Sequence, residues 1–133
     1  MSKTIFETRL ISSLEKVFLD EKLSAPVWDK GSMLNNEVYS FQLAFRIHPG
    51  VSEDNLRCNF DLRTDEKLLT DLSVRQVVSI NSDLPVRENH DEYLLRTEPG
   101  LYPDLLKPIA ESVEARKQWQ TLWITVNPNR KIL

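Results

Sequence analysis

The chain has 133 residues, which is the length of one domain, and its formal net charge is −3. Its composition, 41% hydrophobic and 28% charged residues, provides enough apolar side chains for one core. The negative balance argues against nucleic acid and anionic membrane surfaces as partners, because both attract clustered Lys and Arg side chains.

Cysteine usage and hydropathy exclude further kinds of site and segment. Cys58 is the single cysteine, so an intrachain disulfide and a multi-cysteine metal site are excluded. It lies on the apolar side of an alternating run, which predicts a buried structural thiol. No segment approaches the roughly 20 apolar residues of a transmembrane helix, and the N-terminal segment lacks the apolar core of a signal peptide. We therefore expect a cytoplasmic protein.

The first two candidate elements differ in clarity. Residues 12–19 fit either a short helix capped by Ser12 or Ser13, or an opening strand. Residues 38–48 form the clearest predicted strand, because five large apolar side chains recur at every second position. These side chains are Tyr39, Phe41, Leu43, Phe45 and Ile47, and the positions between them hold Ser40, Gln42, Ala44 and Arg46. The apolar set is expected to bury one side of a sheet.

Further strands are predicted from the same alternation. They cover residues 57–63, 72–81, 93–97 and 121–127. Clusters of Pro, Asn, Asp and Ser separate the candidates, as turns between strands require. This spacing predicts a mainly β fold, an antiparallel β-sandwich of the immunoglobulin-like or galactose-binding-like kind.

Two proline-containing segments interrupt the pattern. Pro99 and Pro103 bracket a Gly-Leu-Tyr turn, so residues 99–106 are predicted to form a stiff loop of one shape. The next segment carries an apolar stripe at helical spacing, but Pro108 would break a helix there. We therefore expect a loop near Pro108 and a short helix around residues 110–117.

The chain offers little catalytic chemistry. Its two histidines, His48 and His90, have no metal-binding spacing, and no glycine-rich phosphate loop or nucleophile elbow is present. The adjacent acids Asp65-Glu66 and Asp91-Glu92 would point to opposite faces of a strand and more simply mark exposed turns. No cofactor, metal site or catalytic residue is predicted, and the chain alone is not expected to be an enzyme.

Aromatic side chains are the remaining candidates for contact with a ligand or another domain. Trp28, Tyr102, Trp119 and Trp123 are amphipathic rings that stack on sugars but also serve as core and interface material. Trp123 lies on the strand face opposite its apolar neighbours, and Tyr102 and Trp119 flank the predicted loop. The candidate contact residues for a ligand or another domain are Tyr102, Asp104, Trp119 and Trp123.

Four segments, in order, resemble one bacterial protein family. Residues 10–18 resemble its opening, and residues 36–44 are similar to its strand in which Ser-Phe-Gln follows an acidic residue. Residues 99–106 are similar to its Tyr-Pro-Asp-x-Leu loop, and residues 118–126 to its Gln-x-Leu-Trp-Ile-Thr-Val strand. Members of this uncharacterised family carry a β-sandwich ahead of a glycoside-hydrolase-like (β/α) barrel and are related to the family 123 glycoside hydrolases.

The resemblance implies a noncatalytic accessory sandwich in carbohydrate metabolism, which packs on a catalytic barrel and shapes the rim of its sugar site. Family 123 enzymes act on N-acetylhexosaminides with an Asp–Glu pair of the barrel, so no catalytic residue is carried over to this chain. It also implies that residues 1–133 are a single sandwich domain, the N-terminal part of a longer protein, with an edge strand missing. An open edge would invite a homo-oligomer. A free-standing carbohydrate-binding module and a protein-interaction domain are the alternatives.

Overall fold

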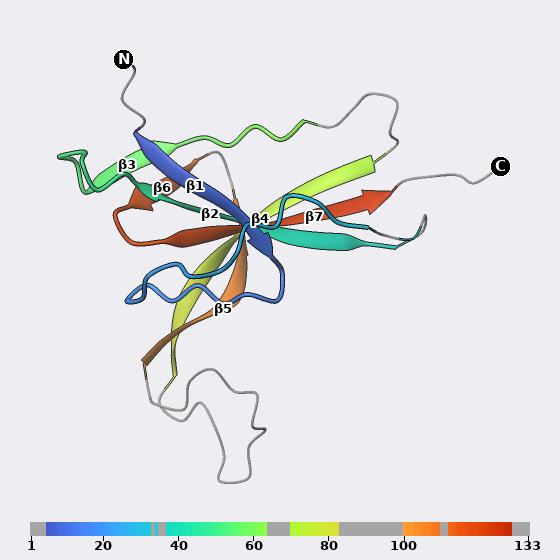
Figure 1. Ribbon diagram of the computed structural model, residues 1–133, viewed down its shortest axis with the longest axis horizontal. Helices are drawn as coiled ribbons and strands as arrows, with labels where there is room; N and C mark the ends of the chain where they lie inside the picture. Colours follow the sequence, from blue (N-terminus) through green and yellow to red (C-terminus); the bar gives the residue numbers. More distant parts are fainter. Residues whose placement is uncertain are drawn as a thin grey trace, which may run out of the picture.

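The computed structural model describes residues 5–32, 34, 37–63, 70–82, 100–109 and 112–128, and all regular structure in these ranges is β-strand (Figure 1). The strands are β1 (Phe6–Ser12), β2 (Tyr39–Ile47), β3 (Asn55–Cys58), β4 (Thr70–Ser82), β5 (Gly100–Pro108), β6 (Val113–Arg116) and β7 (Gln120–Pro128). The mainly β fold predicted from the sequence is confirmed. Within these ranges no helix has the length and apolar character needed to cross a membrane.

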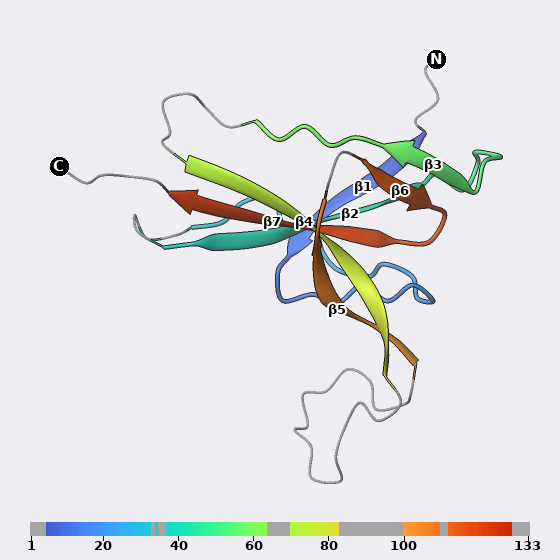
Figure 2. The same cartoon turned by 180° about the vertical axis from the view of Figure 1, so that it is seen from behind.

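The strands form two antiparallel sheets. Five of them pair in the order β1-β2-β7-β4-β5, and β3 pairs with β6 in a second, two-stranded sheet. Figures 1 and 2 both place the small sheet beside the β1–β2 side of the large one. The arrangement is an antiparallel, sandwich-like fold in which β1 and β5 are the edge strands of the large sheet.

The first core lies between the two sheets. Alternate residues of β2 face it, and Phe45 and Ile47 are 1% and 0% exposed. Leu122 of β7 and Val113 of β6 pack in the same cluster. Phe60, which follows β3, meets Phe45 edge to face with 5.1 Å between ring centroids. We call this side of the large sheet the sandwich face.

The opposite face of the large sheet is covered by residues 13–27, which we call the strap. The buried residues of this second cluster are Ile11, Val17, Ala25, Ala44 and Trp119. Arg9 of β1 holds the strap, because its Nη1 donates hydrogen bonds to the carbonyl oxygens of Leu23 (3.2 Å) and Ala25 (2.9 Å). This side, which we call the strap face, is therefore a second core rather than a solvated surface.

Most predicted strands that fall on described residues are confirmed. The predictions for residues 38–48, 72–81 and 121–127 correspond to β2, β4 and β7. The strand predicted at 57–63 ends at Cys58, although Phe60 and Leu62 stay half-buried between exposed neighbours. The strand predicted at 93–97 lies outside the described residues.

Residues 12–19 fit neither of their two predicted forms as a whole. β1 ends at Ser12, the chain turns at residues 13–14, and the strap follows. The opening strand was therefore placed too late in the sequence. Its apolar residue Val17 is buried by the strap's contact with the sheet, not by regular structure of its own.

The predicted helix around residues 110–117 is wrong where the structure describes it, because residues 113–116 are strand β6. Val113 and Ala115 are 3% and 0% exposed, so burial recurs at every second residue. Pairing with β3 satisfies the backbone of β6 and places both side chains in the sandwich core. The helical stripe on which the prediction rested joined residues that belong to two different strands.

The predicted stiff loop at residues 99–106 is also wrong, since β5 begins at Gly100. Pro103 is tolerated because β5 is an edge strand, where one missing N–H donor is least costly. The β4–β5 register also shifts between Val78 and Ile80, opposite this proline. Such an irregularity relieves the local pairing that a proline cannot complete.

Candidate functional site

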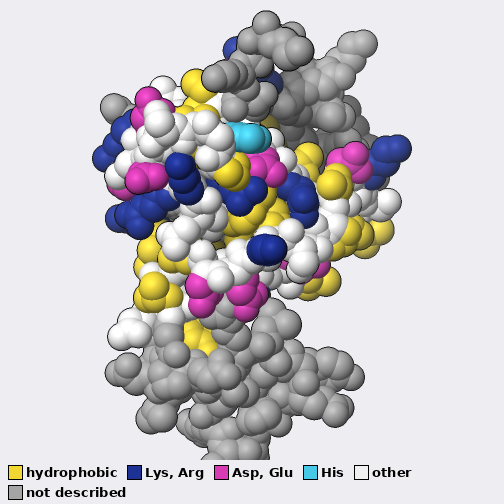
Figure 3. Space-filling view, turned by 60° about the vertical axis from the view of Figure 1, so that its left-hand side comes forward, with side chains coloured by type: hydrophobic (Ala, Val, Ile, Leu, Met, Phe, Trp, Pro, Cys, Tyr) yellow, Lys and Arg dark blue, Asp and Glu magenta, His cyan; other side chains and the backbone are white. Residues whose placement is uncertain are grey.

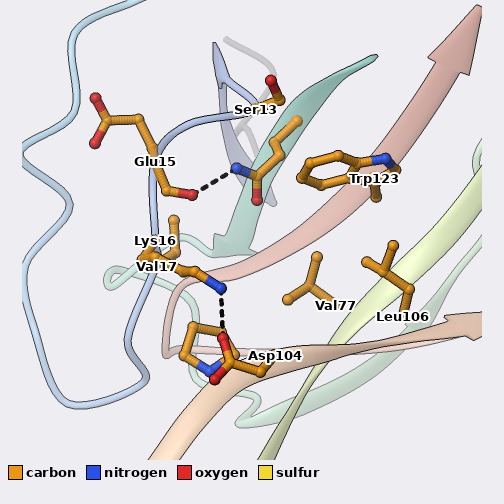
Figure 4. Close-up of a pocket in the computed structure, with 10 residues that line it drawn as sticks. Ser13, Glu15, Lys16, Val17, Val77, Asp104, Leu106 and Trp123 are labelled. Carbon is orange, nitrogen blue, oxygen red and sulfur yellow. Dashed lines mark hydrogen bonds and ion pairs between the residues drawn. The ribbon is translucent and has the colours of Figure 1, made fainter. Parts of the chain in front are cut away.

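The strap and β5 border a cleft on the strap face of the large sheet. Its volume is about 220 Å³, and it lies between the strap, β4, β5 and β7 (Figure 4). The lining residues are Ser13, Glu15, Lys16, Val17, Gln42, Val77, Pro103, Asp104, Leu106 and Trp123.

Three adjacent strands supply the apolar floor. Trp123 of β7, Val77 of β4 and Leu106 of β5 project into the cleft (Figure 4). The pairings Val77 with Thr121 and Val77 with Leu106 show that these side chains share one face. Trp123 is half-buried and Leu106 is 37% exposed, so a molecule in the cleft could reach both.

A buried amide fixes the strap over one end of the cleft. Gln42 is 3% exposed, and its Nε2 donates hydrogen bonds to the carbonyl oxygens of Ser12 (3.0 Å) and Glu15 (2.7 Å). The Glu15 carboxylate points away from the cleft (Figure 4). Because a buried amide without partners is costly, these two bonds explain a glutamine in the most apolar strand.

An ion pair closes the opposite rim. Lys16 of the strap binds Asp104 of β5 through its Nζ, and both side chains are close to half exposed. The pair links two segments that are 88 residues apart in the sequence. At this exposure it contributes at most about 1 kcal/mol, so it orients the rim more than it stabilises the fold.

The four candidate residues divide into two pairs. Asp104 and Trp123 line the cleft, whereas Tyr102 and Trp119 are 9% and 5% exposed and lie within this chain's own packing. Tyr102 meets Phe18 of the strap edge to face, with 5.8 Å between ring centroids.

Trp119 is covered by a cation. The Arg46 guanidinium carbon lies 4.6 Å from the centroid of its ring, a cation–π geometry. The Arg46 side chain is also ion-paired with Glu7 at 2.8 Å. Trp119 and Trp123 therefore do not form one exposed aromatic surface.

A different tryptophan is exposed. Trp28 is 45% exposed, and its Nε1 donates a hydrogen bond to the Tyr39 hydroxyl at 2.7 Å. A Cβ added at Gly31 would overlap the Tyr39 hydroxyl, so a larger residue there would have to displace the Tyr39 ring. The Trp28 ring is thus held in one orientation while part of it remains open to solvent.

The described residues contain no group of three metal-ligating side chains. Burial raises the pKa of the Cys58 thiol, and its Sγ donates to the carbonyl oxygen of Val113 at 3.5 Å. His48 is exposed and its Nδ1 accepts a hydrogen bond from the Gly50 amide at 3.1 Å. The sequence candidates His90, Asp65-Glu66 and Asp91-Glu92 lie outside the described residues.

Charge is mixed on the face drawn in Figure 3. Lys and Arg side chains alternate there with Asp and Glu side chains around exposed apolar groups. Interspersed charges of both signs are typical of an ordinary solvent-exposed surface.

Neither the protein-family models nor the curated proteins with which the sequence was compared match this chain.

Sequence reasoning missed Lys16, Gln42 and Val77 as cleft residues. One signal was available, since Gln42 stands next to the small Ala44 on the second face of the most apolar strand. A small residue and a lone amide on that face indicate close packing of another segment.

Proposed function

We propose that this chain is a noncatalytic accessory β-sandwich that docks on a partner domain through the cleft and the adjoining strand β5. The partner is the glycoside-hydrolase-like barrel implied by the sequence resemblance. The domain shapes the rim of the barrel's sugar site and carries none of the reacting groups.

The observation that carries the proposal is a group of exposed apolar side chains on β4 and β5, of which Leu106 lines the cleft and Leu105 lies on the opposite face of the sheet. They are Ile80 (41% exposed), Leu101 (51%), Leu105 (46%) and Leu106 (37%), all on β4 or β5. Single exposed apolar residues are ordinary, but four of them on two paired strands, with Leu106 beside the half-buried Trp123, are typical of an interface. The burial of Tyr102 and Trp119 counts against a flat aromatic platform for a sugar chain at this site.

Trp123→Ala tests the docking role. In the protein encoded by the complete reading frame, the variant should lower the free energy of unfolding by about 2 kcal/mol more than in residues 1–133 alone, because only the longer protein covers the ring. Chemical denaturation of both proteins measures the difference. Trp28→Ala, at an exposed tryptophan outside the cleft, is the matched control and should have the same effect in both. Equal losses for Trp123→Ala would contradict the proposal.

One observation favours a second candidate, carbohydrate binding at Trp28. Its exposed, hydrogen-bonded ring is the kind of fixed aromatic face on which a sugar ring stacks. Titration of the tryptophan fluorescence with N-acetylglucosamine oligomers tests this function. A saturable change that Trp28→Ala abolishes would favour the binding module over the docking domain.

A further inference from the structure

The two edge strands of the large sheet, β1 and β5, differ in the contacts that the described residues make with their outer sides. At the edge formed by β1, a backbone hydrogen bond is already present, since the Trp28 amide donates to the Leu10 carbonyl oxygen at 2.8 Å. In the described part of the chain, β5 has a strand neighbour on one side only. An edge strand with exposed leucines is a template for another strand.

We propose that β5 pairs antiparallel with β5 of a second copy of this chain, with Leu106 of the two copies at the two-fold axis. This dimer and the docked barrel would compete for strand β5, because Leu106 and Asp104 belong to the cleft lining as well. The experiments below test the dimer without the barrel, so the two proposals can fail separately.

Symmetry limits the possible registers. A two-fold axis that relates two antiparallel edge strands runs perpendicular to the sheet, so it keeps the strap face of one copy on the same side as that of the other. Residues directly opposite each other also share a face. One residue of β5 must therefore lie opposite the same residue of the second copy. A register that pairs Leu105 of one copy with Leu106 of the other is excluded.

Charge and chemistry select among the remaining registers. An axis at Asp104 or Lys107 places like charges opposite each other, which is destabilising. An axis at Pro103 faces two residues that have no N–H donor. An axis at Gly100, Leu101 or Pro108 would pair at most three residues of β5, and an axis at Tyr102 would place Pro103 directly beside the axis. The choice is then between Leu105 and Leu106.

The position of Arg75 favours the register in which Leu106 lies at the two-fold axis. This exposed side chain makes no hydrogen bond or ion pair with any described residue, and it is paired in register with Pro108. With Leu106 at the axis, Pro108 lies opposite Asp104 of the second copy, so Arg75 and that carboxylate lie two strands apart, about 10 Å between backbones, on one face. Asp104 already binds Lys16 of its own chain through Oδ1, so Arg75 would share the carboxylate with Lys16 by approaching its Oδ2. Both side chains can lean over the proline ring to meet. With Leu105 at the axis, the same position holds Tyr102, which offers no charge.

The Leu106 register also joins apolar side chains across the axis. Val77 pairs with Leu106 within each copy, so the row reads Val77, Leu106, Leu106 and Val77 from one copy to the other. Pro103 and Pro108 limit the ladder to a few residues, and the interface is therefore small. A small interface predicts a weak dimer that dissociates on dilution.

Disulfide trapping tests the register. In a Cys58→Ala background, Leu106→Cys should form a disulfide-linked dimer under mild oxidation at least about tenfold faster than Leu105→Cys, because opposite residues bring their Cβ atoms within bonding reach. Leu105 is the matched control, since it is the more exposed of the two, at 46% against 37%. Random collision would favour Leu105→Cys, so equal rates or the reverse order would overturn the proposal.

Sedimentation velocity of charge variants tests the contact between Arg75 and Asp104 of the second copy. The unmodified chain should shift from monomer to dimer as its concentration rises by about two orders of magnitude. Arg75→Glu should abolish the shift, whereas Lys107→Glu, at an exposed cation on the other face, should leave it. A chain that stays monomeric at every concentration, or a dimer unaffected by Arg75→Glu, would refute the inference.

Discussion

Replacing Gln42 with alanine tests whether the strap is part of the fold. The substitution removes two hydrogen bonds and leaves without this donor the carbonyl oxygens of Ser12, at the end of β1, and of Glu15 in the strap. Each hydrogen bond contributes about 1 kcal/mol net, so the free energy of unfolding should fall by about 2 kcal/mol. For a chain of this length that loss lowers the Tm by roughly 6–10 °C.

Urea denaturation of the Gln42→Ala variant gives this free energy directly. Ser40→Ala is the control, because Ser40 lies on the same face of β2 and its Oγ meets Thr125 Oγ1 at a longer 3.3 Å. The control should lose less than about 1 kcal/mol. A change below about 0.5 kcal/mol for Gln42→Ala would mean that the amide is solvated and that the strap does not form a second core.

Three further outcomes are expected. Phe45→Ala should cost about 3–5 kcal/mol by denaturation, since the ring is 1% exposed and packs on Phe60; a loss under about 1 kcal/mol would contradict the sandwich core. Because burial raises the pKa of Cys58, its contribution to stability is present at neutral pH and is lost as pH rises through the folded-state pKa. Cys58→Ala should therefore flatten the decline of the free energy of unfolding at alkaline pH. An unchanged slope of free energy against pH would contradict a buried thiol. Iodoacetamide should also alkylate Cys58 more slowly in the folded chain than in urea, and equal rates would show that the thiol is not shielded.

The strands of the large sheet were predictable where one face is apolar and the other is not. Residues 38–48 and 121–127 alternate strictly, and a period of two is incompatible with a helix. The short strand β6 was not predictable in this way. Its two buried residues, Val113 and Ala115, gain their pattern only from pairing with β3, which lies more than 50 residues away.

The cleft was predictable only in part. Asp104 and Trp123 were candidates from the sequence, but the strap that faces them has no periodicity and is held by side-chain bonds from Arg9 and Gln42. Such bonds depend on tertiary contact and leave no local signal. The same limit applies to β5, where Pro99 and Pro103 indicate a loop unless the strand is known to lie at an edge.

The reading frame that follows Leu133 in the genome tests the central claim most directly. The account predicts that it continues into several hundred residues with the alternating strands and helices of a (β/α) barrel, roughly the 250 residues that such a barrel needs. This sandwich would then be its accessory domain. A stop codon directly after Leu133, or a following segment without that alternation, would contradict the proposed function.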